Sequence, residues 1–306
     1  MAGGTPVRIG TAGWTDPTLI KSKRFYPPGA SSAEARLRYY ASQFPLVEVD
    51  ATYYALPRQE QAGLWVERTP PEFTFNVKAF GLLTGHPVNR KALPADLLEE
   101  VGEQHRDKPR IYASHLPPKA VEEAWRRFHE ALLPLDSAGK LGAVLLQYPE
   151  WFTPRHASRE ELRQVPGRLP GYRVCVELRN RAWLEDRDRD HTLATLRELG
   201  FALVCVDMPQ GFRSSMPPLA EVTSPGLAVV RFHGRNREAW AKRGATVQER
   251  FRYLYREEEL REWVPRIRKL ADAAQEVHVV MNNCYADYAV RNGRDLQGLL
   301  SSDSPS

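Results

Sequence analysis

The sequence predicts an α/β fold, a single (β/α)8 barrel of the TIM type, and three observations support this. Eight apolar runs of strand length recur along the 306 residues, with helical stretches between them, as in repeated βα units. No Gly/Ser-rich linker divides the chain, so we expect one domain over residues 1–306, with a core at about 7–300 and a disordered tail at 301–306. A doubly wound sheet, the competing arrangement, normally carries a GxGxxG loop after its first strand, and "GTAGW" lacks this form.

The predicted strands show alternating or continuous apolar character. In chain order they cover residues 7–14, 46–54, 73–80, 141–148, 173–179, 201–208, 227–234 and 277–283. Helical periodicity falls between or after them at 33–44, 59–68, 120–133, 192–199, 260–274 and 287–300. Eight strands, each followed by a helix, is the count of a TIM barrel. The long connections 82–119 and 235–259 follow strands three and seven, so both should lie over the end where barrel active sites are built.

Composition narrows the class of protein. Hydrophobic residues make up 42% of the chain, yet no run approaches the length of a membrane span. The start, "MAGGTPVRIG", lacks the pattern of a secretory signal. The three cysteines, Cys175, Cys205 and Cys284, share no CxxC spacing and are expected to be buried free thiols, so we expect a cytoplasmic protein without a zinc cluster. A formal net charge of +5 permits anionic partners, although a GC-rich genome or heat adaptation would give the same balance.

Strand parity gives the sharpest functional signal, because side chains of a barrel strand alternate between the interior and the helices. On several strands the ionisable residues share one face and gather toward the carboxyl end. The residues predicted to point inward are Glu48, Asp50, Lys78, Glu177, Arg179, Asp207, Arg231 and His233, with Asn76, Gln147 and Asn282. These groups could simply pair with one another, as Glu177 with Arg179 or Asp207 with Arg231. A barrel interior that served stability alone would be filled with Val, Ile and Leu, so the sequence predicts a ligand site at the C-terminal mouth.

This set of side chains suits acid–base chemistry on an anion. Lys and Arg can hold a phosphate, a carboxylate or an oxyanion, and the carboxylates can transfer protons or hold a divalent cation. The predicted catalytic residues are Glu48, Lys78, Glu177, Asp207 and His233. The predicted substrate-binding residues are Trp14, Tyr53, Gln147, Arg179, Trp183, Arg231, Arg235 and Asn282. No metal ligands are predicted, and no GxSxG, HExxH, CxxC or Walker motif is present.

Aromatic residues also gather at or just after the predicted strand ends, among them Tyr54, Trp151 and Trp240. With nearby arginines they could stack on the bases of a nucleic acid, or roof a pocket for one small ligand. Packing between the loops and the barrel rim is the alternative without function. The sequence leaves these three interpretations open.

An ordered series of motifs resembles a known family. The series consists of "GTAGW", "YYASQFPLVEVDATYYALP", "FTFNVKA", "LGAVLLQYP", "VCVELRNRAW", "VVRFHGRN" and "VHVVMNNCYADYAVRN". In this order they resemble the YecE-like family, domain of unknown function 72. The resemblance implies a cytosolic TIM barrel without an assigned activity. It implies functional positions at Glu48, Thr52, Tyr53, Lys78, Gln147, Glu177, Arg179, Trp183, Asp207, Arg231, His233, Gly234, Asn282 and Asn283.

Three positions depart from the family pattern: Asp50 replaces a frequent Asn, Asn180 a frequent His, and Cys284 a frequent acid. The sequence thus predicts an enzyme that acts on a small phosphorylated or carboxylated substrate, as a hydrolase or an isomerase. A phosphodiesterase acting on nucleic acid is a special case. The alternative is a non-catalytic protein that binds a metabolite or nucleic acid through the same mouth. The oligomeric state stays open.

Overall fold

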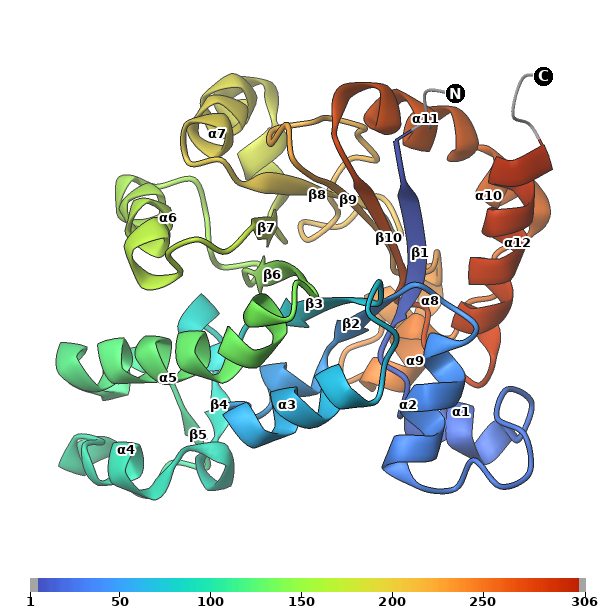
Figure 1. Cartoon of the computed structure of the whole chain (residues 1–306). Helices are drawn as coiled ribbons and strands as arrows, with labels where there is room; N and C mark the ends of the chain where they lie inside the picture. Colours follow the sequence, from blue (N-terminus) through green and yellow to red (C-terminus); the bar gives the residue numbers. More distant parts are fainter. Residues whose placement is uncertain (1–4, 303–306) are drawn as a thin grey trace.

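The computed structural model describes residues 5–302, and its centre is a closed barrel of parallel strands (Figure 1). The barrel strands are β1 (Val7–Ala12), β2 (Leu46–Val49), β3 (Thr74–Lys78), β6 (Leu141–Gln147), β7 (Val174–Glu177), β8 (Ala202–Asp207), β9 (Ala228–Phe232) and β10 (Val277–Met281). Around the barrel they follow chain order, and β1 closes the sheet by pairing with both β2 and β10. Each lies inside one of the predicted strand segments, so the predicted TIM barrel is confirmed.

Helices cover the outside of the barrel, because the outward side chains of the strands are apolar and must be buried. These are α1 (Pro17–Ser22), α2 (Ala33–Ala41), α3 (Gln59–Glu67), α5 (Pro118–Ser137), α6 (His156–Arg168), α7 (Asp186–Glu198), α10 (Glu257–Arg261), α11 (Val264–Ala273) and α12 (Tyr288–Ser302). No helix was predicted at the position of α6, because its only buried side chains are Arg159, Leu162 and Val165 and its apolar stripe is weak.

The connection from β8 to β9 departs from the expected pattern. Residues 208–227 contain no helix, so the expectation that a helix follows every strand is wrong at this place. Further along, the single helix expected at 260–274 is divided into α10 and α11. The tail expected to be disordered begins inside α12, which ends at Ser302, and its residues 303–306 lie outside the described part of the chain.

The two long connections carry short elements of their own. The one after β3 holds α4 (Ala95–Glu99) and a two-stranded antiparallel ribbon of β4 (Val88–Asn89) and β5 (Arg110–Ile111), which Figure 1 shows beyond the barrel, next to α5. The one after β9 holds α8 (Arg237–Ala241) and α9 (Val247–Phe251). Single 3-10 turns lie at Ala51–Tyr53, Gly81–Thr84, Arg90–Ala92, Glu103–His105, Ala113–His115 and Arg181–Leu184.

Two further expectations concern burial and membranes. Cys175 and Cys205 are buried free thiols, as predicted, whereas Cys284 is only half-buried. Within residues 5–302, no helix is both long and apolar enough to cross a membrane.

The barrel interior around Asn76 and His278 is packed tightly, and this packing requires glycine at two positions. Asn76 Oδ1 and His278 Nδ1 lie 3.0 Å apart inside the barrel. A Cβ on Gly142 would lie 2.6 Å from Asn76 Oδ1, and a Cβ on Gly10 would lie 1.9 Å from the main-chain oxygen of Leu46. Larger side chains are therefore excluded at both positions.

We predict that Gly10→Ala lowers the free energy of unfolding by about 3 kcal/mol or more, because the added methyl group can only fit if β1 and β2 separate. Urea unfolding followed by circular dichroism measures this change. Gly63→Ala is the matched control: it lies inside α3 with open space around its Cβ, and should stabilise the protein by about 0.5–1 kcal/mol. Equal effects of the two substitutions would contradict the prediction.

Candidate functional site

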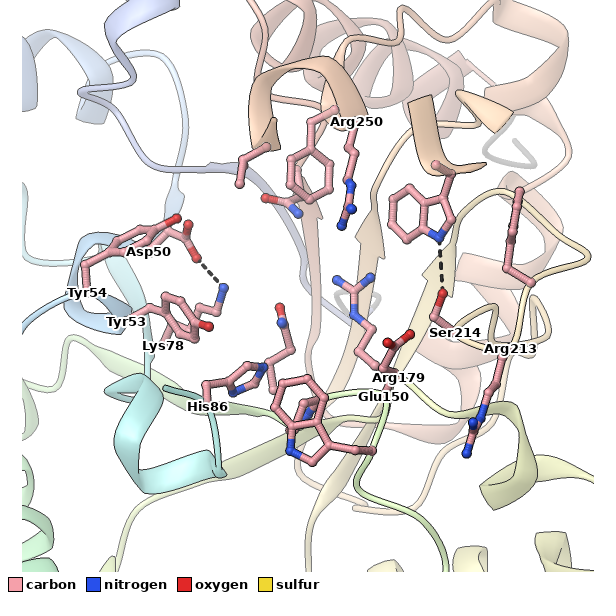
Figure 2. A pocket seen from close by; sticks show the side chains of 18 residues that line it. Asp50, Tyr53, Tyr54, Lys78, His86, Glu150, Arg179, Arg213, Ser214 and Arg250 are labelled. Atoms are coloured by element: carbon pink, nitrogen blue, oxygen red, sulfur yellow. Dashed lines mark hydrogen bonds and ion pairs between the residues drawn. The ribbon is translucent and has the colours of Figure 1, made fainter. Parts of the chain in front are cut away.

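A cavity of 580 Å³ lies at the carboxyl ends of the barrel strands, where the loops surround it (Figure 2). Five of its lining residues come from strand ends, namely Asp50, Lys78, Gln147, Arg179 and Asn282. The others come from connections, namely Tyr53, Tyr54, His86, Pro149, Glu150, Trp151, Phe212, Arg213, Ser214, Trp240, Val247, Arg250 and Phe251. This is the mouth at which the sequence predicts a ligand site.

Below the cavity, the barrel interior holds a fully buried ion cluster. Arg231 is 1% exposed; its Nη2 lies 2.5 Å from Glu48 Oε1, and its Nη1 bonds to Glu177. Glu177 also pairs with the guanidinium of Arg179, the member of the cluster that reaches the cavity. The barrel register explains this meeting, since Glu48 and Glu177 lie on inward positions of β2 and β7, and Arg231 on one of β9.

The two carboxyls of this cluster differ in their electrostatics. Burial alone would raise the pKa of Glu177, but Arg179, Arg231 and His233 together hold it well below its ordinary value. Burial also acts on Glu48, and there it outweighs the attraction of Arg231, so the pKa of Glu48 is raised. Glu177 is therefore a fixed negative charge that orients two guanidinium groups, while Glu48 completes the bonding of Arg231.

His233 connects the cluster to the lining of the cavity. It is fully buried, and burial, with Arg179 beside it, lowers its pKa to about 3, so the ring is neutral. Nδ1 of the ring lies 2.8 Å from Asn282 Nδ2, and Nε2 lies 3.3 Å from both Glu177 Oε1 and Arg179 Nη2. His233 thus positions Asn282 from below and does not itself line the cavity.

Asp50 and Lys78 form a second ion pair, at the cavity surface. Lys78 Nζ lies 2.8 Å from Asp50 Oδ1 and 4.4 Å from the centroid of the Tyr53 ring. Thr52 Oγ1 donates to the main-chain oxygen of Lys78 (2.5 Å), which fixes the end of β3. Burial would raise the pKa of Asp50, but Lys78 outweighs it and the pKa is lowered, so this carboxylate is ionised at neutral pH.

Sequence reasoning missed several residues of the site, His86 among them. Its Nδ1 lies 3.1 Å from Thr84 Oγ1, and burial, with Lys78 and Arg179 nearby, lowers its pKa to about 4. The available signal was the long connection after β3, which was expected to cover the mouth. Which of its side chains enters the cavity depends on a left-handed turn at Gly85 (φ 76°), and the sequence alone does not specify this turn. Arg213 and Arg250 were also missed, because they lie on connections whose path the sequence alone does not specify.

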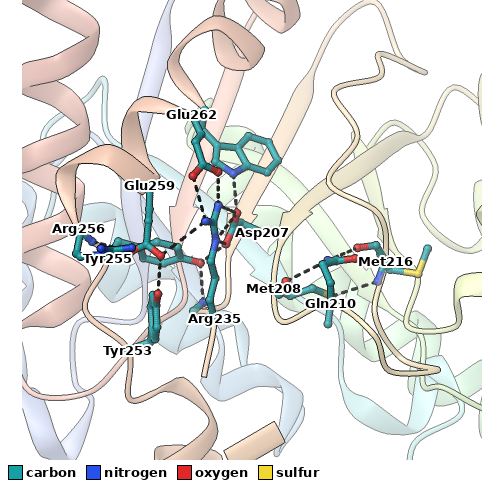
Figure 3. Close-up of polar contacts among 12 residues, drawn as sticks. Asp207, Met208, Gln210, Met216, Arg235, Tyr253, Tyr255, Arg256, Glu259 and Glu262 are labelled. Atoms are coloured by element: carbon teal, nitrogen blue, oxygen red, sulfur yellow. Dashed lines mark hydrogen bonds and ion pairs between the residues drawn. The ribbon is translucent and has the colours of Figure 1, made fainter. Parts of the chain in front are cut away.

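The predicted inward position of Asp207 is wrong. Asp207 lies level with Phe232, whose ring packs on the outer side of the barrel against Tyr255 and Trp263. Its carboxylate accepts bonds there from Arg235 Nη2 (2.7 Å), Tyr255 Oη (2.6 Å) and Trp263 Nε1 (2.7 Å) (Figure 3). Since no helix follows β8, polar groups from the later chain cover this face. The expected pair of Asp207 with Arg231 is therefore replaced by Asp207 with Arg235.

Three predicted substrate-binding residues also lie away from the cavity. Trp14 packs edge-on against Trp65, with ring centroids 6.0 Å apart, on the outer side of the barrel. Trp183 is fully buried and donates through Nε1 to the main-chain oxygen of Phe152 (2.6 Å). Arg235 is occupied by Asp207 and Glu262. Aromatic and cationic side chains at strand ends can pack outward as readily as inward, which parity does not decide.

The predicted site residues thus fall into three groups. Lining the cavity are Tyr53, Lys78, Gln147, Arg179 and Asn282. In the buried cluster beneath it are Glu48, Glu177, Arg231 and His233. Elsewhere are Trp14, Trp183, Asp207 and Arg235.

The sequence also permitted a divalent cation held by carboxylates, and this arrangement does not favour one. Glu48, Asp50 and Glu177 each accept a bond from an arginine or a lysine, so their oxygens are already engaged with cations. In the described part of the chain, no group of three or more His, Cys, Asp or Glu side chains is arranged to hold a metal ion.

Fold and site together define a TIM-barrel protein with a cation-rich cavity at the C-terminal ends of its strands. The chain belongs to the family described as "Protein of unknown function DUF72", which it matches over residues 8–305, and this confirms the resemblance seen in the sequence.

Relatives of known sequence and structure agree with this assignment. The chain is 31% identical to the UPF0759 protein YunF of Bacillus subtilis over 297 residues, which are 96% of this chain and 94% of the relative. The crystal structure of a DUF72 family protein from Enterococcus faecalis V583 is similar with a TM-score of 0.78, at 27% identity, covering 98% of this chain and 97% of that one. A DUF72 family protein from Thermotoga maritima gives a TM-score of 0.75 at 28% identity, covering 97% and 99%.

We predict that Arg231→Met lowers the free energy of unfolding at neutral pH by about 3–5 kcal/mol, because two buried carboxylates lose their shared cation. Without Arg231, burial raises the pKa of Glu48 further, so the folded variant binds a proton that the unfolded chain releases. The deficit should therefore be smaller at about pH 5 than at about pH 8.

Urea unfolding at the two pH values measures this effect. Arg38→Met is the control, because Arg38 pairs with Glu34 on an exposed helix surface and its loss should matter little. A deficit that grows as the pH falls would contradict the prediction.

We also predict that His233→Asn makes stability less sensitive to acid. The folded pKa of about 3 lies below the ordinary value of 6.5, so only the unfolded chain binds this proton between the two values. The wild type therefore loses stability as the pH falls through this window, and the variant should lose about 1.4 kcal/mol less per pH unit. Urea unfolding at several pH values measures the slope. An unchanged slope in a correctly folded variant would assign the loss to other groups.

Proposed function

We propose that the protein is an enzyme that acts on a small phosphorylated or carboxylated substrate bound in the mouth cavity. The observation that supports this most strongly is an excess of positive charge. Lys78, Arg179, Arg213 and Arg250 line the cavity, against Asp50 and Glu150. Within residues 5–302, no carboxylate lies within 4.0 Å of the guanidinium of Arg213 or Arg250, so both are available to an anion.

Arg179 is the best prepared of these cations. Its Nε forms an ion pair with Glu177 from below, its Nη2 lies 3.3 Å from His233 Nε2, and the group lines the cavity (Figure 2). Figure 2 shows Arg250 above Arg179, so an anion between the two would be held from both sides. A guanidinium group that a carboxylate of the protein already holds needs little reorganisation when an anionic ligand binds, which favours both affinity and catalysis.

Asp50 and Lys78 are the groups best placed for the chemical step. Asp50 is ionised and can accept a proton from a water molecule or from a carbon beside a carbonyl group. Lys78, bonded to it, can stabilise the negative charge that develops on the substrate. Hydrolysis by general-base catalysis and isomerisation through an enolate both use such a proton transfer. In this proposal Glu48, Glu177, Arg231 and His233 are positioning residues.

A non-catalytic binding protein is the second candidate, and one observation favours it. Glu48, Glu177 and His233, which the sequence predicted as catalytic, are at most 1% exposed and are already bonded to other groups of the protein. Only the Asp50–Lys78 pair then remains for chemistry. The two candidates differ in whether the bound anion is converted.

We predict that a screen of phosphorylated and carboxylated metabolites, with short oligonucleotides as a further class, yields a ligand that stabilises the wild type. Saturation at 100 times the dissociation constant corresponds to about 2.7 kcal/mol. Arg250→Ala should lose most of this stabilisation. Arg243→Ala should keep it, because Arg243 lies on the same connection but does not line the cavity. Thermal unfolding with and without each compound measures the effect.

Turnover of the stabilising compound distinguishes the two candidates. Asp50→Asn should bind the compound and lose at least about 100-fold in turnover. Binding without conversion by the wild type would indicate the binding protein. Equal stabilisation of the wild type and of Arg250→Ala would contradict the proposed site.

A further inference from the structure

We propose that the substrate is a phosphate monoester that carries a planar ring, of the size and chemistry of a nucleoside monophosphate. This inference rests on the proposed function, because it concerns the same cavity. It adds a second requirement to the anion: a flat ring that stacks on the aromatic wall of the mouth, formed by Tyr53, Tyr54, His86 and Trp151.

The first argument is the exposure of apolar side chains around the mouth. Among the described residues, six large hydrophobic side chains are exposed, and three of them line this one cavity. Tyr54 and Trp151 are each 55% exposed and Val247 is 59% exposed, and each comes from a different connection. A single exposed apolar side chain needs no explanation, but three around one cavity mark a surface that a ligand covers.

The second argument is that the rings of the aromatic wall are continuous. Ring centroids lie 5.0 Å apart for Tyr53 and Tyr54, 5.3 Å for Tyr53 and His86, and 5.9 Å for His86 and Trp151. All are edge-to-face contacts, and Trp151 and Tyr54, at the two ends, are the exposed members of the wall. The lowered pKa of His86 keeps its ring neutral, so the wall does not itself bind the anion.

The third argument is the position of the cations relative to this wall. Figure 2 shows Tyr53, Tyr54 and His86 on one side of the cavity, Arg213 and Ser214 on the other, and Arg179 and Arg250 between the two sides. A ligand whose anion lies between Arg179 and Arg250 therefore has an aromatic surface within reach of its remaining part. The cavity volume of 580 Å³ is in the range that holds a whole small molecule, and an isolated anion would leave most of it empty.

The fourth argument concerns the anion. Arg250 and Arg213 have no carboxylate partner among the residues described, and Arg179 has donors left beyond its bond to Glu177. Several arginine forks suit the three oxygens and the double negative charge of a phosphate monoester better than a single carboxylate.

Calorimetric titration of the wild type with four probes tests this inference: adenosine monophosphate, phenyl phosphate, ribose 5-phosphate and adenosine. Adenosine monophosphate should bind at least about tenfold more tightly than ribose 5-phosphate, because stacking of one base on an aromatic side chain contributes about that factor. Phenyl phosphate should also bind more tightly than ribose 5-phosphate if any flat ring suffices, and with equal affinity if a heterocycle is needed. Both outcomes support a substrate that carries a ring. Adenosine alone should bind weakly.

Two variants separate the ring from the anion. Trp151→Ala should lower the affinity for adenosine monophosphate about tenfold and leave the affinity for ribose 5-phosphate unchanged, whereas Arg250→Ala should lower both affinities. Tyr112→Ala is the control, because Tyr112 is an exposed aromatic residue (38%) that does not line the cavity.

Each contrary result has a distinct meaning. Equal affinities for adenosine monophosphate and ribose 5-phosphate, both unaffected by Trp151→Ala, would overturn the inference that the substrate carries a stacking ring. The anion site of the proposed function would remain. Binding of carboxylates alone would overturn the phosphate monoester and leave the broader proposal. Binding of no anion at all would overturn both.

Discussion

The buried guanidinium of Arg231, held between Glu48 and Glu177, is the interaction on which the rest of the site depends. Three charges without solvent are costly, and they persist in a barrel interior only when each is bonded to an opposite charge. The barrel supplies this condition, because inward positions of β2, β7 and β9 bring the three side chains together in its interior. Glu177 then has an oxygen left for Arg179, so the position of the cavity floor follows from the pairing beneath it.

This arrangement separates the charges that position from the charges that can meet a ligand. Glu177 and the neutral ring of His233 act below the cavity and fix Arg179 and Asn282, which line it. Asp50 and Lys78 are paired at the surface of the cavity and do not depend on Arg231 for their contact. In the proposed function, a substrate would meet a floor whose donors are already oriented, together with the ionised carboxylate of Asp50. Oriented charge in a partly enclosed site is what electrostatic catalysis requires.

Strand parity could predict the part of this site that the strands carry, because the barrel fixes which residues face inward once the strands are known. It identified Glu48, Glu177 and Arg231 without any structure, and the eight-strand count gave the fold. It could not decide Asp207, since "ALVCVD" is apolar on both faces and the missing helix after β8 cannot be read from that strand. The lining residues His86 and Arg250 are placed by loop turns and by packing between segments far apart in the chain, for which local sequence has no periodic signal.

Asp207 nevertheless contributes to the mouth, through the connection that carries Arg250. Its carboxylate binds Arg235 at the start of that connection and Tyr255 near its end, and Tyr255 Oη in turn accepts from the main-chain nitrogen of Gly234 (2.8 Å). Gly234 has a left-handed backbone (φ 84°), and a Cβ there would lie 2.7 Å from the Cβ of Tyr253, so the chain can leave β9 in this direction only with glycine. The segment between these two anchored ends holds α8 and α9, which bring Trp240, Arg250 and Phe251 over the cavity. The outward-facing aspartate therefore holds in place the loop half of the site, as Glu177 holds the strand half.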